Sequence, residues 1–181
     1  MTMIGRFAVV LLALVSMSAA KTKVELKDGQ GKDVGSVVIW DQGSGVALEV
    51  NVHDLTPGEH GIHFHQVSKC EGPDFKSAGG HFNPESKKHG FDSPDGHHAG
   101  DMKNFTVGAN GKAKTRLEDA DVTLKEGAHS LLTNGAAIVI HAKGDDYNAA
   151  TEAANAFIDG DQVLLKWGDQ TGKTKANSGA I

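Results

Sequence analysis

Several residue types are scarce in this chain of 181 residues, and each shortage excludes something. There is one cysteine, Cys70, so no intrachain disulfide can form, and its thiol is expected either reduced or in an interchain disulfide. The formal net charge is −5, which gives no reason to expect nucleic acid or an anionic lipid surface as a partner. Beyond residue 20, no apolar run approaches the roughly twenty residues that a membrane-spanning helix needs.

The first twenty residues differ in composition from the rest. Arg6 is followed by the largely apolar run FAVVLLALVSM, and then by small residues at Ser18 and Ala20. A basic start, a short apolar stretch and a small-residue end predict a secretory signal peptide over residues 1–20. A membrane anchor, the alternative, would need a longer run. The mature domain is then expected to span residues 21–181, to be periplasmic or secreted, and to have no membrane partner after cleavage.

The remaining chain consists mostly of short strand patterns separated by glycine-rich turns. Alternating or β-branched residues predict strands over 21–27, 34–40, 46–55, 61–66, 136–143 and 162–167, with a turn at 56–61. Asn110-Gly111 is a strong hairpin signal and predicts a strand on each side of it. Residues 151–157 could form a short helix. The pattern predicts an all-β fold, a Greek-key β-barrel or sandwich of about eight antiparallel strands.

Histidines gather in two places along this pattern. His63 and His65 lie two residues apart in GIHFH, so they share one face of the predicted strand while Phe64 takes the other. On its own this spacing is weak, because a pair of surface histidines would look the same. His141 ends the apolar strand pattern at 136–143, where a lone histidine is more often packed than a ligand.

The second place is the loop GGHFNPESKKHGFDSPDGHHAGD, residues 79–101. Glycine and proline here leave little apolar surface with which the loop could order itself. Its ligand-type side chains are His81, His89, His98 and Asp101. Three imidazoles and one carboxylate suit tetrahedral zinc, and a bound metal would cross-link the loop. The alternative is a solvated loop with incidental histidines.

Taken together, these motifs resemble the copper/zinc superoxide dismutases, and most of all their secreted bacterial branch. GEHGIHFH, SAGGHFNP, KHG, HAGD and IVIHAKGDD follow in order over roughly residues 57–146. The resemblance implies copper ligands at His63, His65, His81 and His141. It implies zinc ligands at His81, His89, His98 and Asp101, so that His81 bridges the two metals. Asp145 would be the carboxylate that links one copper ligand to one zinc ligand, His63 to His89.

The function implied by the resemblance is the conversion of superoxide to dioxygen and hydrogen peroxide at copper, with zinc ordering the loop. His81 would be both a ligand and a proton carrier, and is therefore the implied catalytic residue. A copper- or zinc-binding protein on the same scaffold, with little turnover, is the alternative. The resemblance also leaves a homodimer open.

The resemblance ends near the C-terminus. No arginine follows Arg116, so the family's anion-guiding arginine has no counterpart, and the chain has no second cysteine to form the family's disulfide with Cys70. Residues 148–181 match no family motif clearly. Three lysines, Lys143, Lys166 and Lys173, are candidates for the missing positive charge, although lysine lacks the planar fork of arginine.

Overall fold

The computed structural model describes residues 21–148 and the backbone of residues 163–167. The described strands are β1 (Lys21–Lys27), β2 (Asp33–Gln42), β3 (Gly45–Val52), β4 (Gly58–His60), β5 (Ile62–His65), β6 (Phe105–Val107), β7 (Ala113–Asp119), β8 (Ala136–Ile140) and β9 (Val163–Trp167). One short 3-10 helix, η1, spans Lys76–Ala78. The predicted signal peptide and the predicted helix at 151–157 lie outside the described residues. In the part that is described, no helix has the length and apolar character to cross a membrane.

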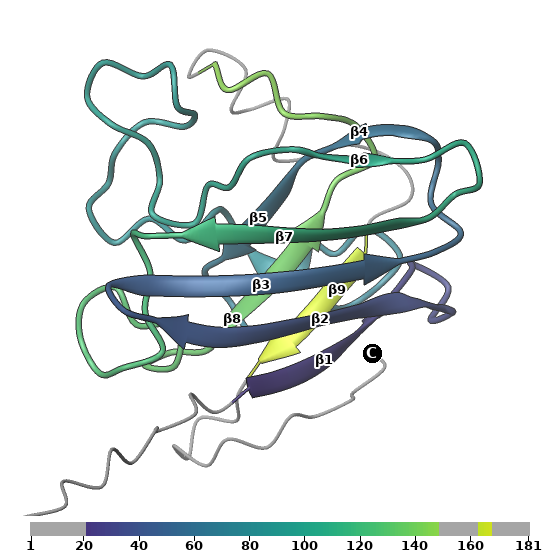
Figure 1. Cartoon of the computed structure of the whole chain (residues 1–181). Coiled ribbons are helices and arrows are strands. Elements are labelled where there is room, and N and C mark those ends of the chain that lie inside the picture. The colour runs from purple at the N-terminus through teal and green to yellow at the C-terminus, as the bar shows by residue number, and fades with distance from the viewer. Residues whose placement is uncertain (1–20, 149–162, 168–181) are drawn as a thin grey trace, which may run out of the picture.

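The strands form two antiparallel layers. β1, β2, β3 and β7 make one layer, and β5, β8 and β9 make a second that crosses behind the first in Figure 1. The layers are continuous, because β9 lies between β8 and β1, where Lys27 pairs with Leu164. β4 and β6 form a separate two-stranded sheet. The predicted all-β architecture is confirmed, with nine described strands in place of about eight.

The core lies between the two layers. Both layers supply side chains that are at most 1% exposed, among them Leu26, Ile39 and Leu48 from the first layer and Phe64 and Ile138 from the second. Each such side chain contributes about 1.5–3 kcal/mol when it leaves water. On β5, Phe64 faces this core, so the strand's alternation sends His63 and His65 to the opposite side.

The prediction that the two strands on either side of Asn110-Gly111 pair with each other as a hairpin is wrong. The turn itself forms, because the N–H of Gly108 donates to the carbonyl of Lys112 at 2.9 Å. The flanking strands, however, take other partners: β6 pairs with β4, and β7 pairs with β3. A turn signal reports local backbone geometry, whereas the partner of a strand is chosen by what each strand can bury. The segment Gly58–His60, predicted to be part of a turn, is strand β4.

Cys70 is buried, with 5% of its surface exposed. It packs in a small apolar cluster with Phe75, Ala78, Ala137 and Val139. This burial favours the reduced thiol over an interchain disulfide, because a bond to another chain needs an accessible sulfur.

Asp119, at the end of β7, is a buried carboxyl group with 5% exposure. Its Oδ1 accepts the N–H of Asp121 at 2.9 Å, while its buried Oδ2 meets no hydrogen-bond donor among the described residues. Burial raises the pKa of Asp119 to about 7. Between about pH 4 and 7, the folded chain therefore keeps a proton on Asp119. The unfolded chain, in which an aspartate has a pKa of about 3.9, has already lost it there.

We expect this carboxyl group to make the protein less stable as pH rises. The folded pKa is raised, so the free energy of unfolding should fall between about pH 4 and 7 and stay low above it. Between pH 5.5 and 8.5 the expected loss is on the order of 2 kcal/mol. Asp119→Asn cannot ionise and should lack this component. Urea unfolding of both proteins at the two pH values checks this, and an equal decline in the variant would contradict it.

Candidate metal centre

Strand β5 is the base of the site. One edge of β5 pairs with β8, and the other is bridged by the long loop, at His63 with Asp101 and at His65 with His81. The loop therefore places two of its predicted ligands beside the two histidines of the strand. Residues 16 and 38 positions apart in the sequence meet because the loop begins and ends on the same short strand.

The loop is anchored at Phe64. The N–H of Phe82 donates to the Phe64 carbonyl at 2.7 Å, and the N–H of Phe64 donates to the Gly100 carbonyl at 2.9 Å. A Cβ atom at Gly100 would lie 2.5 Å from the Phe64 carbonyl oxygen, so only glycine allows this approach. Both ends of the segment 81–101 are thus fixed to one residue of the scaffold.

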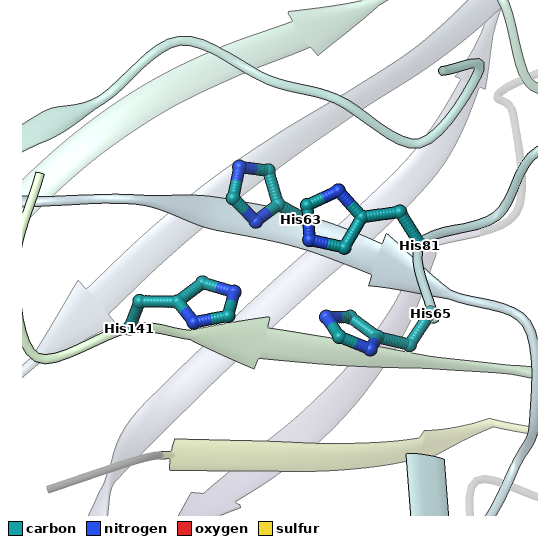
Figure 2. A group of neighbouring side chains, drawn as sticks. All are labelled: His63, His65, His81 and His141. Carbon is teal, nitrogen blue, oxygen red and sulfur yellow. The ribbon is translucent and has the colours of Figure 1, made fainter. Parts of the chain in front are cut away.

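The first cluster contains His63, His65, His81 and His141. Their four rings turn toward one another, two from β5, one from the loop and one directly after β8 (Figure 2). Each ring offers a nitrogen atom, and these atoms all lie within 4.8 Å of one another. All four side chains are buried.

Hydrogen bonds fix two of these rings from behind. His63 uses Nε2 for Asp145 Oδ2 at 2.9 Å, and His65 uses Nδ1 for the Gly79 carbonyl at 2.7 Å. The opposite nitrogens, His63 Nδ1 and His65 Nε2, are buried and make no hydrogen bond to any described residue, and the same holds for both nitrogens of His141. Buried polar atoms without a partner are costly, so this donor set fits a metal ion that would occupy their lone pairs.

The second cluster contains His81, His89, His98 and Asp101, again with ligand atoms within 4.8 Å of one another. His81 Nδ1 lies 2.8 Å from Asp101 Oδ1 and 3.3 Å from His98 Nδ1. His89 Nδ1 lies 3.3 Å from Asp101 Oδ2. Three imidazole nitrogens and one carboxylate therefore converge, which is a fitting donor set for tetrahedral zinc. His81 belongs to both clusters.

The electrostatics of the first cluster and of Asp101 favour metal binding. Burial, followed by the neighbouring histidines, lowers the pKa of His63, His65 and His141 well below the ordinary value, so these rings are neutral and can coordinate. Burial opposes ionisation of Asp101, but hydrogen bonds from His81, His89 and His98 outweigh it and lower the pKa of Asp101 far below its usual range. A carboxylate is thus present at neutral pH.

Asp145 connects the two clusters. Its Oδ2 accepts from His63 Nε2 at 2.9 Å, and its Oδ1 accepts from His89 Nε2, also at 2.9 Å. Burial raises the pKa of Asp145, but these two hydrogen bonds outweigh burial and hold it well below the ordinary value. Because Nε2 of each ring meets Asp145, Nδ1 of His63 is directed at the first cluster and Nδ1 of His89 at the second.

Four of the ten histidines lie outside both clusters, namely His53, His60, His97 and His129. His53 pairs with Asp33 at 3.1 Å, and His129 pairs with Glu85 at 3.2 Å. His60, however, has a supporting place that the sequence did not indicate. Its Nδ1 lies 2.7 Å from the carbonyl of His141 and its Nε2 lies 2.8 Å from the carbonyl of Thr56. No sequence signal separates such a histidine from a solvent-facing one.

The lysines considered for the missing positive charge are only partly described. Lys143 is exposed. Lys166 pairs through its backbone with Ala137 in β8, and its side chain lies outside the described part of the chain, as does the whole of Lys173.

Removal of metal is expected to loosen the loop of residues 66–101 while the two strand layers stay folded. Apart from η1, most of this loop lies outside regular secondary structure, and the ligands of the second cluster would cross-link it. Protons compete with metal for the imidazoles, so a chelator at mildly acidic pH should release the ion. Amide hydrogen exchange checks this expectation. Metal removal should speed exchange in the loop much more than exchange in β2 or β3. Equally slow loop exchange in metal-free and metal-loaded protein would contradict it.

Comparison with known proteins agrees with this geometry. The family model of copper/zinc superoxide dismutase (SODC) matches residues 34–165. The superoxide dismutase-like protein YojM of Bacillus subtilis is 41% identical over 138 residues, covering 74% of this chain and 70% of that protein. The Cu-Zn superoxide dismutase 1 of Aquifex aeolicus is 38% identical over 143 residues, covering 77% of this chain and 85% of that protein.

Solved structures show the same likeness. The crystal structure of a SOD-like protein from Bacillus subtilis superposes with a TM-score of 0.74 at 35% identity, covering 82% of this chain and 99% of that one. The Cu/Zn superoxide dismutase from Brucella abortus gives a TM-score of 0.66 at 25% identity, covering 81% and 99%. The chain belongs to the copper/zinc superoxide dismutase family.

Proposed function

We propose that this chain is an exported superoxide dismutase, which converts superoxide to dioxygen and hydrogen peroxide with copper and zinc as cofactors. The observation that supports this most is the pair of buried four-residue clusters that share His81. Enzymes of this family are copper- and zinc-dependent, and the two clusters offer four ligands for each metal, with His81 common to both.

The donor sets differ in a way that suits the two metals. The copper ligands would be His63, His65, His81 and His141. The zinc ligands would be His81, His89, His98 and Asp101. An all-imidazole set suits a copper ion that changes oxidation state, whereas three imidazoles and a carboxylate are a common tetrahedral zinc set.

When bound, copper supplies the one-electron chemistry that oxidises one superoxide to dioxygen and reduces a second, which takes up two protons to become hydrogen peroxide. His81 is the catalytic residue that we assign. Its Nδ1 faces Asp101 and His98, so Nε2 is the nitrogen left for the copper side and can hold a proton there. From that atom a proton can pass to the reduced substrate. The carboxylate of Asp101 keeps the ring in this orientation.

Export is proposed from the sequence of the first twenty residues, with a periplasmic or secreted location for the mature domain over 21–181. Arg6, the apolar run after it and the small residues up to Ala20 support this proposal. Mass determination of the N-terminus of the mature protein tests it, and the expected first residue is Lys21.

A metal-binding protein with little turnover remains the second candidate. It is favoured by the absence of any arginine after Arg116, together with the formal net charge of −5. Superoxide is a small anion, and electrostatic steering can raise association rates about 10–10³-fold. We therefore expect a measurable rate of superoxide dismutation. At low salt, this rate should be lower than in family members that have the guiding arginine.

One experiment separates the two candidates. Copper and zinc content and the rate of superoxide dismutation are measured on the same metal-loaded sample. The proposed enzyme holds both metals and turns over superoxide. A sample with both sites filled and a rate no higher than the metal-free chain would overturn the enzyme and favour the metal-binding protein.

A further inference from the structure

The segment that carries Asp145 has no regular secondary structure to hold it. β8 ends at Ile140, and residues 141–148 form no strand or helix. The carboxylate of Asp145 nevertheless meets His63 and His89 at 2.9 Å each, and its side chain is 1% exposed. A ring can be oriented only as well as the group that orients it, so other residues must fix Asp145.

Asn104 provides the first of these contacts. Its Nδ2 donates to the main-chain carbonyl of Asp145 at 2.8 Å, and its Oδ1 accepts the N–H of Asp145 at 2.9 Å. The amide thus pairs with both main-chain groups of one residue, as a neighbouring strand would. Only a side chain with a donor and an acceptor on the same carbon can do this, so aspartate could not replace it.

Tyr147 provides the second. Its phenol oxygen accepts the N–H of Asn104 at 2.7 Å, and its own N–H donates to Asp145 Oδ1 at 2.9 Å. Its carbonyl accepts the N–H of Asp92 at 3.3 Å. A Cβ atom at Gly90 would lie 2.0 Å from that carbonyl oxygen, so the glycine directly after His89 permits this close approach.

The tyrosine ring is itself covered. Phe91 lies against it with ring centroids 5.5 Å apart, and the Lys103 ammonium sits 3.7 Å from the centre of the Phe91 ring and 4.7 Å from that of Tyr147. These residues follow the ligands His89 and Asp101 closely in the sequence. The segment 145–147 is therefore held between the two parts of the chain that leave the second cluster.

We propose that Asn104 and Tyr147 are positioning residues of the two-metal centre, which act by fixing Asp145 and, through it, His63 and His89. The proposal rests on the proposed function of the two clusters. One carboxylate serves both clusters, so disturbing this pair alters zinc binding and the copper environment together. Asn104 also begins an Asn-Phe-Thr glycosylation sequon. Its Nδ2 is hydrogen-bonded to the Asp145 carbonyl and is therefore not available to carry a sugar.

The test uses two changes in the full chain. Asn104→Asp is isosteric but places an oxygen against the Asp145 carbonyl, and Tyr147→Phe keeps the ring and removes only the phenol oxygen. The control is Asn110→Asp, because toward the described residues that exposed asparagine uses only its Oδ1, which accepts the N–H of Lys112 at 3.2 Å. Zinc affinity is measured by competition with a chelator, and the Cu(II) site by electron paramagnetic resonance.

Asn104→Asp is expected to weaken zinc binding about 10–100-fold and to shift the Cu(II) spectrum, while Asn110→Asp leaves both unchanged. Tyr147→Phe should change both in the same direction by a smaller factor. Wild-type zinc affinity and a wild-type spectrum in both variants would overturn the proposal. If Asn104→Asp does not fold, Tyr147→Phe decides alone. Neither readout requires turnover, so an inactive wild type would refute the proposed function and leave this test intact.

Discussion

Changing His141 to alanine is expected to reduce superoxide dismutation to the level of the metal-free protein. Both ring nitrogens of His141 are buried and make no hydrogen bond to any described residue, so the ring contributes little to the polar network of the fold. Its three neighbours in the first cluster are His63, His65 and His81. Without the fourth imidazole, copper loses one ligand and the site opens to water. The second cluster keeps all four of its ligands.

The measurement compares wild type and His141→Ala at verified metal content, with His53→Ala as the control. His53 is a surface histidine paired with Asp33, so its loss should leave copper, zinc and rate unchanged. We expect zinc content to stay at the wild-type level in His141→Ala while bound copper falls. Equal rates in wild type and His141→Ala would show that activity arises elsewhere, and the metal-binding protein would become the better description.

The ligand-type side chains of the loop stood out in the sequence by residue type, whereas the full ligand sets, with His141, were implied by the resemblance to the copper/zinc superoxide dismutases. Strand alternation alone places His63 and His65 on one face of β5, but it does not distinguish two ligands from two surface histidines. Asn104 and His60 could not be found in this way. Their partners are main-chain atoms of Asp145 and His141, and no residue type signals that a distant carbonyl or N–H group needs a partner.

Which strands pair with each other could not be predicted from the sequence either. Asn110-Gly111 predicted a turn, and a turn is present, but β6 and β7 separate to join different sheets. The local pattern at 162–167 predicted a strand without showing where it would pair. The structure inserts this strand between β8 and β1, which makes the last described segment an interior one.

Ending the chain at Gln162 is therefore expected to prevent stable folding. β9 pairs with β8 along its whole length, from Ala136 with Trp167 to Ile140 with Val163, and it joins the second layer to the first at Leu164 with Lys27. Its loss would leave an open edge on β8, which carries core side chains and leads into His141. A domain of this size has only about 5–15 kcal/mol of stability, and losing an interior strand removes a large part of it.

The control is a chain that ends at Trp167, which keeps every residue of β9 and separates loss of the strand from loss of length. We expect the longer form to unfold cooperatively on heating, and the shorter form to show no cooperative transition and to aggregate through the open edge of β8. Circular dichroism melting and zinc binding of both forms check this. A cooperative transition in the shorter form at the temperature of the full chain would show that β9 is dispensable. In that case β1 and β8 would have to close the sheet directly, and the position of His141 would not depend on the C-terminal strand.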